Sequence, residues 1–154
     1  MPRSWIALGK AFFSDRNEIV PETPGERKGH ITFGTANNPH KYSREVFAAW
    51  AGVLNAVPGS RFAFIRPEAS GATFQHNVRD LFARNGVDPA RVEFHPIRGQ
   101  HMPFYNELDV SLDTFPLTGG TTTTESLWMG VPLVSLKGEM FHERLSYSIM
   151  TNAG

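Results

Sequence analysis

The sequence contains no cysteine. Disulfide bonds, thiolate metal sites and a cysteine nucleophile are therefore excluded. It also has no apolar run that approaches the roughly 20 residues of a membrane-spanning helix. Its first residues, M-P-R-S-W-I-A-L-G-K, lack the long apolar region of a signal peptide. We therefore expect a soluble, cytoplasmic protein without a membrane span.

An excess of charge of either sign is also absent, because 15 Lys and Arg residues balance 15 Asp and Glu residues. This balance gives no indication of nucleic acid or an anionic membrane as a partner, although a local basic pocket is compatible with it. No two of the six histidines have H-x-x-x-H spacing, and no G-x-S-x-G motif is present. A zinc site and a serine-hydrolase elbow are therefore not expected.

What is present is an ordinary globular balance, with 40% hydrophobic and 19% charged residues in 154 positions. Such a chain suits a single domain with one core. Residues 1–29 are polar and rich in Pro and Gly in their second part, which predicts a linker or entry segment. Residues 30–154 form the predicted domain. The last letters, T-N-A-G, come where a helix would close on a glycine, so we expect a domain that is incomplete at its C-terminus.

From His30 onward, short apolar runs alternate with segments of helical periodicity. The periodicity predicts helices from Ser43 to about Val57, around Phe74 to Phe82, over about 102–107, from the threonine run to before Gly130, and over about 141–153. The apolar runs predict strands at 31–35, 61–67, 91–96, 109–113 and 131–136. This alternation predicts an α/β fold, a Rossmann-like parallel sheet with helices on both faces. Ligands of such sheets bind at the carboxyl ends of the strands, near the switch point.

One loop at that edge reads T-G-G-T-T-T-T-E, over residues 118–125. Its Gly-Gly turn precedes a helix start, where free N–H groups and the helix dipole favour an anion. The alternative is that Thr121 or Thr122 is only an N-cap and that Glu125 only complements the dipole. Spacing alone does not choose between the two interpretations. The stretch is neither a Walker A motif nor G-x-G-x-x-G.

The other loops offer further polar groups. Lys41 comes just before a helix start, which is unfavourable for the helix unless the cation meets an anion there; a solvated surface lysine is the alternative. Asn37 and Asn38 supply amide groups or only shape the turn. In the loop after the third strand, Arg98, Gln100 and His101 are suited to a base or a phosphate, or are ordinary loop residues. A catalytic pair of Asp113 with Glu125 has weak support, because Asp113 ends a strand and suits a turn.

Three segments carry a family resemblance: F-G-T-A-N-N-P-H-K, R-V-E-F-H-P-I-R-G-Q-H and L-D-T-F-P-L-T-G-G-T-T-T-T-E-S-L-W-M-G-V-P-L-V. In this order they resemble the C-terminal, donor-binding half of the O-linked N-acetylglucosamine transferase/SPINDLY-like glycosyltransferases (family 41, GT-B architecture). The bacterial adhesin-modifying N-glycosyltransferases of the family are similar. The resemblance covers residues 30–154. The animal enzymes have histidine where this chain has Gly120, which favours the SPINDLY or bacterial branch.

The resemblance implies that a UDP-sugar donor binds here without a metal or other cofactor, for transfer of a sugar such as N-acetylglucosamine or a hexose to a polypeptide side chain. It implies that Lys41 neutralises the diphosphate leaving group and that Glu125 binds the ribose. It also implies that Thr121 and Thr122 bind the phosphates, that His101 lies in the nucleotide site and that Asn38 is a polar amide near the lysine. From their loop positions we add Arg98, Gly119 and Gly120 to the expected donor-site residues.

The family's first Rossmann-like domain and its helical repeats, which hold the polypeptide acceptor, have no counterpart in these 154 residues. We therefore expect the chain to be inactive in transfer by itself. The alternatives are a non-catalytic nucleotide or nucleotide-sugar binding module and, with less support, a sugar-nucleotide epimerase of related architecture.

Overall fold

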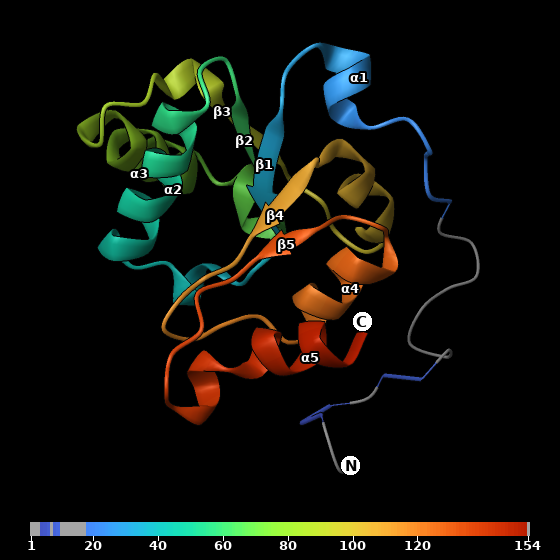
Figure 1. The fold of residues 1–154 in the computed structure, drawn as a ribbon. Coiled ribbons are helices and arrows are strands. Elements are labelled where there is room, and N and C mark those ends of the chain that lie inside the picture. Colours follow the sequence, from blue (N-terminus) through green and yellow to red (C-terminus); the bar gives the residue numbers. More distant parts are fainter. Residues whose placement is uncertain (1–3, 7, 10–17, 154) are drawn as a thin grey trace.

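A computed structural model describes residues 4–6, 8–9 and 18–153. Its centre is a five-stranded sheet in which every neighbouring pair is parallel, in the order β3-β2-β1-β4-β5 (Figure 1). The strands are β1 (Thr32–Thr35), β2 (Arg61–Ile65), β3 (Val92–His95), β4 (Val110–Leu112) and β5 (Leu133–Val134). The predicted α/β class and parallel sheet are confirmed.

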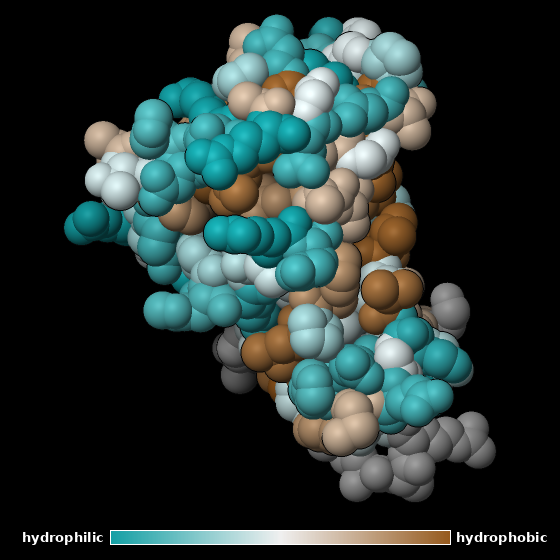
Figure 2. Space-filling model, turned by 90° about the vertical axis from the view of Figure 1, so that its left-hand side faces the viewer, coloured by the Kyte–Doolittle hydropathy of each residue, from teal (hydrophilic) through white to brown (hydrophobic). Residues whose placement is uncertain are grey.

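Helices cover both faces of the sheet, as predicted (Figure 1). One face carries α2 (Arg44–Ala56) and α3 (Ala72–Arg84), and the other carries α4 (Thr121–Trp128) and α5 (Leu145–Ala153). The outward side of α2 and α3 is mostly hydrophilic (Figure 2). Short 3₁₀ helices complete the connections: η2 (Pro39–Lys41), η3 (Pro67–Ser70), η4 (Pro89–Arg91), η5 (Met102–Glu107) and η6 (Phe141–Glu143).

Each face of the sheet has its own apolar core. The α2/α3 face is rich in aromatic rings, and Trp50 lies 4.9 Å from Phe62 between ring centroids. The opposite core is smaller and lies under η5 and the end of α4, where Tyr105, Leu108 and Met129 are buried. Strand residues alternate between the two cores, as the pleat requires: Phe62 and Phe64 belong to the first and Ala63 and Ile65 to the second.

The last predicted helix, over about 141–153, is in fact two segments. The helix η6 ends at Glu143, and α5 begins at Leu145. The Glu143 carboxylate accepts the backbone N–H groups of Glu139 and Met140, both at 2.8 Å, which closes a separate turn before α5. The predicted glycine closure of the helix at Gly154 lies outside the described residues.

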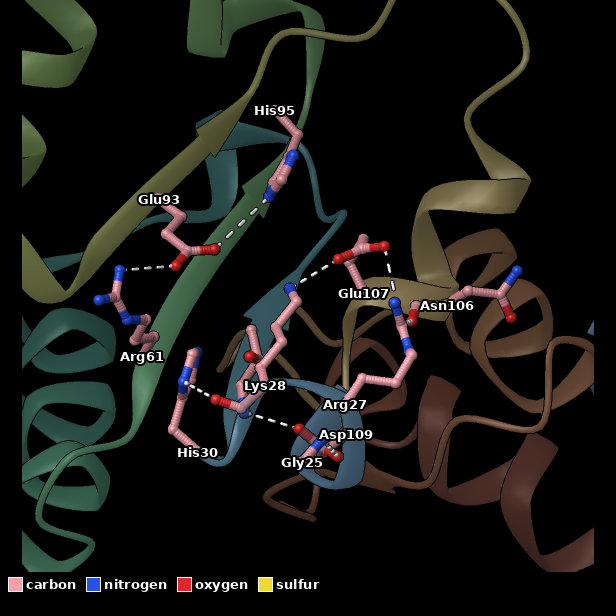
Figure 3. A network of polar contacts seen from close by, with 11 residues as sticks. Gly25, Arg27, Lys28, His30, Arg61, Glu93, His95, Asn106, Glu107 and Asp109 are labelled. Carbon is pink, nitrogen blue, oxygen red and sulfur yellow. Dashed lines mark hydrogen bonds and ion pairs between the residues drawn. The ribbon is translucent and has the colours of Figure 1, made fainter. Parts of the chain in front are cut away.

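A short helix, α1 (Pro24–Lys28), lies within the predicted linker or entry segment 1–29. A capping box of Thr23 and Glu26 starts it. The Asp109 carboxylate fastens it to the sheet, because it accepts the N–H of Gly25 at 2.8 Å and that of Thr32 at 2.7 Å. Lys28 adds an ion pair with Glu107 at 2.6 Å (Figure 3). Residues 1–3, 7 and 10–17 of the predicted segment lie outside the described residues.

These contacts lie at the amino ends of β1 and β4, opposite to the edge where a ligand is expected. Among residues 18–153 and the described positions before them, no helix is long and apolar enough to cross a membrane.

Candidate functional site

The candidate site lies at the carboxyl ends of β1 and β4, where the order of the sheet reverses. From β1 the chain proceeds to β2 and β3 on one side, and from β4 it proceeds to β5 on the other. The loops after β1 and β4 therefore diverge and leave a crevice between them, which is the usual ligand position in open parallel sheets. These loops contain Lys41 and the T-G-G-T-T-T-T-E stretch.

The helix α4 begins at Thr121 with Gly120 as its N-cap, and no side chain caps it. The sequence left open whether Thr121 or Thr122 was only a cap, and neither residue has that position. The first N–H groups of an α-helix have no partner within the helix, and the helix dipole adds partial positive charge there. The start of α4 is thus suited to an anionic ligand.

The four threonines have four different environments. Thr121 is exposed at the crevice. The Thr122 hydroxyl donates to Oδ1 of Asn37 at 3.1 Å. Thr123 is fully buried and shares a hydrogen bond of 2.7 Å with the hydroxyl of Ser146 in α5. Thr124 donates to the backbone oxygen of Gly120 at 3.2 Å. The first two threonines therefore face the candidate site, and the last two stabilise the start of the helix.

The close approach at Gly119 explains why a glycine stands there. A Cβ at this position would meet the Thr123 hydroxyl, and it would lie 3.0 Å from Oγ1 of Thr122 and 3.1 Å from Oδ1 of Asp113. The N–H of Gly119 donates to the same Asp113 oxygen at 2.8 Å. At Gly120 a Cβ would lie 2.9 Å from the ring of Trp5. Both glycines thus permit tight packing around the start of α4.

Lys41, at the end of η2, is half-buried, and its ammonium group reaches the loop after β4. Its ammonium group donates to Oδ1 of Asn37 at 3.2 Å and to the backbone oxygen of Thr118 at 3.0 Å. A lysine has three donors, so one N–H remains for a ligand. Burial lowers the pKa of Lys41, and the negative charge of Asp113 acts in the opposite direction.

Asn37, rather than Asn38, has the central position in the first loop. Asn37 is 3% exposed, and its Oδ1 accepts hydrogen bonds from both Lys41 and Thr122. The side chain of Asn38 is exposed and accepts the N–H of His40 at 3.0 Å, so it caps η2 and shapes the turn. The sequence could not separate these adjacent asparagines.

Asp113 is a second residue whose role the sequence did not indicate. It is 5% exposed and accepts five hydrogen bonds. Its Oδ1 accepts from the side chain of Asn37 at 3.1 Å and from the N–H groups of Thr114 and Gly119 at 2.8 Å each. Its Oδ2 accepts from Ser135 at 2.6 Å and from Ser146 at 2.5 Å. Asp113 has no contact with Glu125 among these partners, so it joins β4, β5, α5 and the loop after β1 rather than forming a carboxylate pair.

Beside the start of α4 lies a cavity of about 240 Å³. Its apolar wall includes Ile65 and Ile97, and its polar wall includes Thr121, Thr122 and Glu125. Arg66 also lines it, with its guanidinium held by two hydrogen bonds of 3.0 Å to Glu68. Its remaining lining residues are Ala36, Pro67, Gly99 and His101. Arg98 is exposed and does not line this cavity.

Inside the cavity, Glu125 joins the loop after β3 to α4. Glu125 is 4% exposed, and its Oε1 lies 3.0 Å from Nε2 of His101. The hydroxyl of Tyr105 donates to Oε2 at 3.1 Å. The hydrogen bond to Glu125 raises the pKa of His101, while burial acts against it. Burial raises the pKa of Tyr105 well above its ordinary value. Since a carboxylate has about four lone-pair sites, Glu125 retains acceptors for a ligand.

Of the predicted site residues, the structure thus brings Lys41, Gly119, Gly120, Thr121, Thr122, His101 and Glu125 to one sheet edge. Asn38 and Arg98 belong to loops at this edge, and both are exposed to solvent. The side chain of Asn38 accepts a backbone N–H, that of His40. Sequence reasoning missed Arg66 and Tyr105 as site residues. The only feature of the sequence that could have indicated them is their position in the segments that follow β2 and β3.

Comparison with known proteins gives a consistent result. Residues 24–154 match the family model described as Glycosyl transferase family 41. The chain is 38% identical over 157 residues, and over its full length, to a probable UDP-N-acetylglucosamine–peptide N-acetylglucosaminyltransferase SPINDLY of Oryza sativa subsp. japonica. It is also 38% identical over 139 residues, 88% of its length, to the protein of the same description from Arabidopsis thaliana. It spans 17% and 15% of the lengths of these two relatives.

Among solved structures, a mutant of the O-GlcNAc transferase of Thermobaculum terrenum is similar, with a TM-score of 0.77 and 32% sequence identity. The match covers 86% of this chain and 26% of that chain. The resemblance to O-linked N-acetylglucosamine transferase and SPINDLY is therefore confirmed. The narrower assignment to a bacterial branch stays a prediction.

Proposed function

This chain belongs to glycosyl transferase family 41, whose model matches residues 24–154, and on this premise we propose that it binds the UDP-sugar donor of a glycosyltransferase. The sugar, such as N-acetylglucosamine or a hexose, is transferred to a polypeptide side chain. One observation carries the proposal: a half-buried lysine, Lys41, and the uncapped start of α4 meet at the sheet's switch point through the side chain of Asn37.

In this proposal the diphosphate lies against Gly119, Gly120, Thr121 and Thr122. The free N–H groups at the start of α4 bind its oxygens, and the remaining N–H of Lys41 donates to it. The Thr122 hydroxyl gives its only proton to Asn37, so this residue binds a phosphate oxygen through its backbone N–H while its hydroxyl stays bonded to Asn37. Negative charge develops on the diphosphate as the sugar leaves. Groups held around it therefore stabilise the transition state more than the bound donor.

The nucleoside end occupies the adjacent cavity. At about 240 Å³ this cavity is smaller than the roughly 300–1,000 Å³ of typical small-molecule sites, so it holds only part of the donor. Its apolar wall of Ile65 and Ile97 suits the flat base, and Glu125 accepts hydrogen bonds from the ribose hydroxyls, as acidic residues do in dinucleotide-binding folds. His101 orients the Glu125 carboxylate. Asn38 enters the proposal only by resemblance, and Arg98 only by its position in the loop after β3.

We further propose that transfer requires no metal, because Lys41 and the start of α4 supply the positive charge that a cation would otherwise provide. Since the chain spans 15 to 17% of the length of its plant relatives, we propose that other segments hold the polypeptide acceptor and that the 154 residues alone bind the donor without turnover.

Calorimetric titration of the chain with UDP, GDP, ADP and uridine tests the proposal. We expect UDP to bind more tightly than GDP and ADP because the cavity selects the base, and more tightly than uridine because the diphosphate adds contacts. Equal affinity for the three diphosphates would indicate a generic phosphate site. Absence of binding by all of them would contradict a nucleotide site. If the donor binds but a longer protein that contains this chain transfers no sugar to peptides, the chain is a non-catalytic binding module.

A further inference from the structure

We infer that Asn37 is a positioning residue that holds Lys41 and Thr122 in place for the diphosphate, and that Asp113 fixes the orientation of the Asn37 amide. This inference rests on the proposed donor site. None of the family motifs quoted above assigns a role to either residue. The two side chains are 76 positions apart in the sequence and meet only because β1 and β4 are neighbours.

The orientation of the Asn37 amide follows from its partners. Its oxygen faces two donors, the Lys41 ammonium at 3.2 Å and the Thr122 hydroxyl at 3.1 Å. Its nitrogen faces an acceptor, the Asp113 carboxylate at 3.1 Å. A rotated amide would place its NH₂ group against an ammonium group and its oxygen against a carboxylate, so that both contacts with charged groups would become repulsive. The charges of Lys41 and Asp113 therefore permit only one orientation.

A single oxygen atom, Oδ1 of Asn37, thus joins the two phosphate-binding residues, and the backbone oxygen of Thr118 holds Lys41 as well. Lys41 comes from the loop after β1, and Thr122 comes from α4, after β4. Without a shared acceptor, these groups would be positioned by separate loops. Because both donate to Oδ1 of Asn37, a shift of that atom moves both. A site that is arranged before the ligand arrives loses less entropy on binding. It also needs less reorganisation in the transition state.

Asp113 has the surroundings that such an anchor requires. The backbone N–H groups of Thr114 and Gly119 and the hydroxyls of Ser135 and Ser146 donate to it, so it is held from the strand ends and from α5. It is also the charged group whose field raises the pKa of Lys41 against the effect of burial. Asp113 therefore acts on Lys41 twice, through the Asn37 amide and through its charge.

The experiment compares the wild-type chain with Asn37→Ala, Asp113→Asn and, as control, Asn77→Ala. Asn77 is exposed on α3, which covers the other face of the sheet. Affinities for UDP and for uridine are measured by calorimetry over a range of pH. NMR titration of lysine side chains, of which the chain has four, gives the pKa of Lys41. Near-ultraviolet circular dichroism verifies that the aromatic core of each variant is folded.

For Asn37→Ala we expect UDP affinity to fall about tenfold, the effect of one or two net hydrogen bonds, with uridine affinity unchanged. For Asp113→Asn, whose neutral side chain keeps the shape and lets the serine hydroxyls rotate, we expect a lower pKa of Lys41. UDP affinity should then be lost at a lower pH than in the wild type. Asn77→Ala should match the wild type in all measurements.

The results separate this inference from the proposed donor site. If the wild type binds no nucleotide, the donor site is wrong, whereas the pKa of Lys41 in Asp113→Asn still tests whether Asp113 acts on the lysine. If the wild type binds UDP and both folded variants retain its affinity and the Lys41 pKa, the positioning role is overturned. Equal losses of UDP and uridine affinity in Asn37→Ala would also overturn it, because they would indicate a general structural effect.

Discussion

Oε1 of Glu125 lies 3.0 Å from Nε2 of His101. This contact joins α4 to the loop after β3, and it closes one side of the cavity in which we place the nucleoside. The carboxylate is almost fully buried, whereas the imidazole is 39% exposed at its side chain. The protonation of the accessible His101 ring therefore affects its hydrogen bond with the buried Glu125 carboxylate. We expect the stability that this contact provides to depend on pH.

We expect the variant His101→Gln to lose stability in a pH-dependent way. The hydrogen bond to Glu125 raises the pKa of His101 above the ordinary value of 6.5. The additional stability is therefore fully present below about pH 6.5 and is lost as the pH rises through the raised pKa. The difference in Tm between wild type and variant should be larger at pH 6 than at pH 9. A difference that is constant across this range would show that the protonated ring has no special interaction.

Lys41→Ala should reduce turnover more than it weakens donor binding, because the charge on the diphosphate increases as the sugar leaves. The measurement compares kcat for transfer, in a longer protein that contains this chain, with the Kd for UDP-sugar. Lys28→Ala is the control, since Lys28 is also partly buried but pairs with Glu107 at the opposite end of the sheet. Unchanged kcat in Lys41→Ala would exclude the proposed role.

Glu125→Gln tests the ribose contact. The substitution keeps the shape of the side chain but replaces one acceptor oxygen by an NH₂ group. We expect the affinity for UDP to fall about tenfold, as for the loss of a hydrogen bond to a charged group. The affinity for 2′-deoxy-UDP should fall less, because that ligand lacks one hydroxyl partner. Equal losses for the two ligands would indicate that Glu125 only stabilises the cavity through Tyr105 and His101.

Gly119→Ala should destabilise the start of α4 by about 1–3 kcal/mol, the usual cost of overpacking. Its Cβ would meet the hydroxyls of Thr122 and Thr123 and the carboxylate of Asp113. The matched control is Gly52→Ala in α2, where no atom lies within 4 Å of a Cβ; there alanine should stabilise the helix by about 0.5–1 kcal/mol. Urea denaturation measures both. A loss of stability in Gly52→Ala equal to that in Gly119→Ala would refute the steric explanation.

The fold could largely be predicted from the sequence because its signals are local. Apolar periodicity indicated each strand of the sheet and the helices that cover its two faces, and alternation then required a parallel sheet; it did not indicate α1. The T-G-G-T-T-T-T-E stretch indicated a helix start with close backbone approach, and the resemblance proposed roles for Lys41 and Glu125.

The internal order of the site could not be predicted, because it depends on contacts between distant residues. Asn37 and Asp113 are 76 positions apart, and no local pattern distinguishes Asn37 from Asn38. The break between η6 and α5 depends on how the Glu143 carboxylate turns back to the backbone. Such a contact cannot be recognised from the periodicity of apolar residues.

The most direct test is a UDP titration followed by backbone amide NMR, which locates the bound nucleotide. We predict saturable shifts at Asn37–Lys41, Gly119–Glu125 and His101, with little change in α1 or α3. Shifts confined to another part of the chain, such as the cavity of about 190 Å³ beside Ile19 and Pro132, or no shifts at saturating UDP, would contradict this prediction.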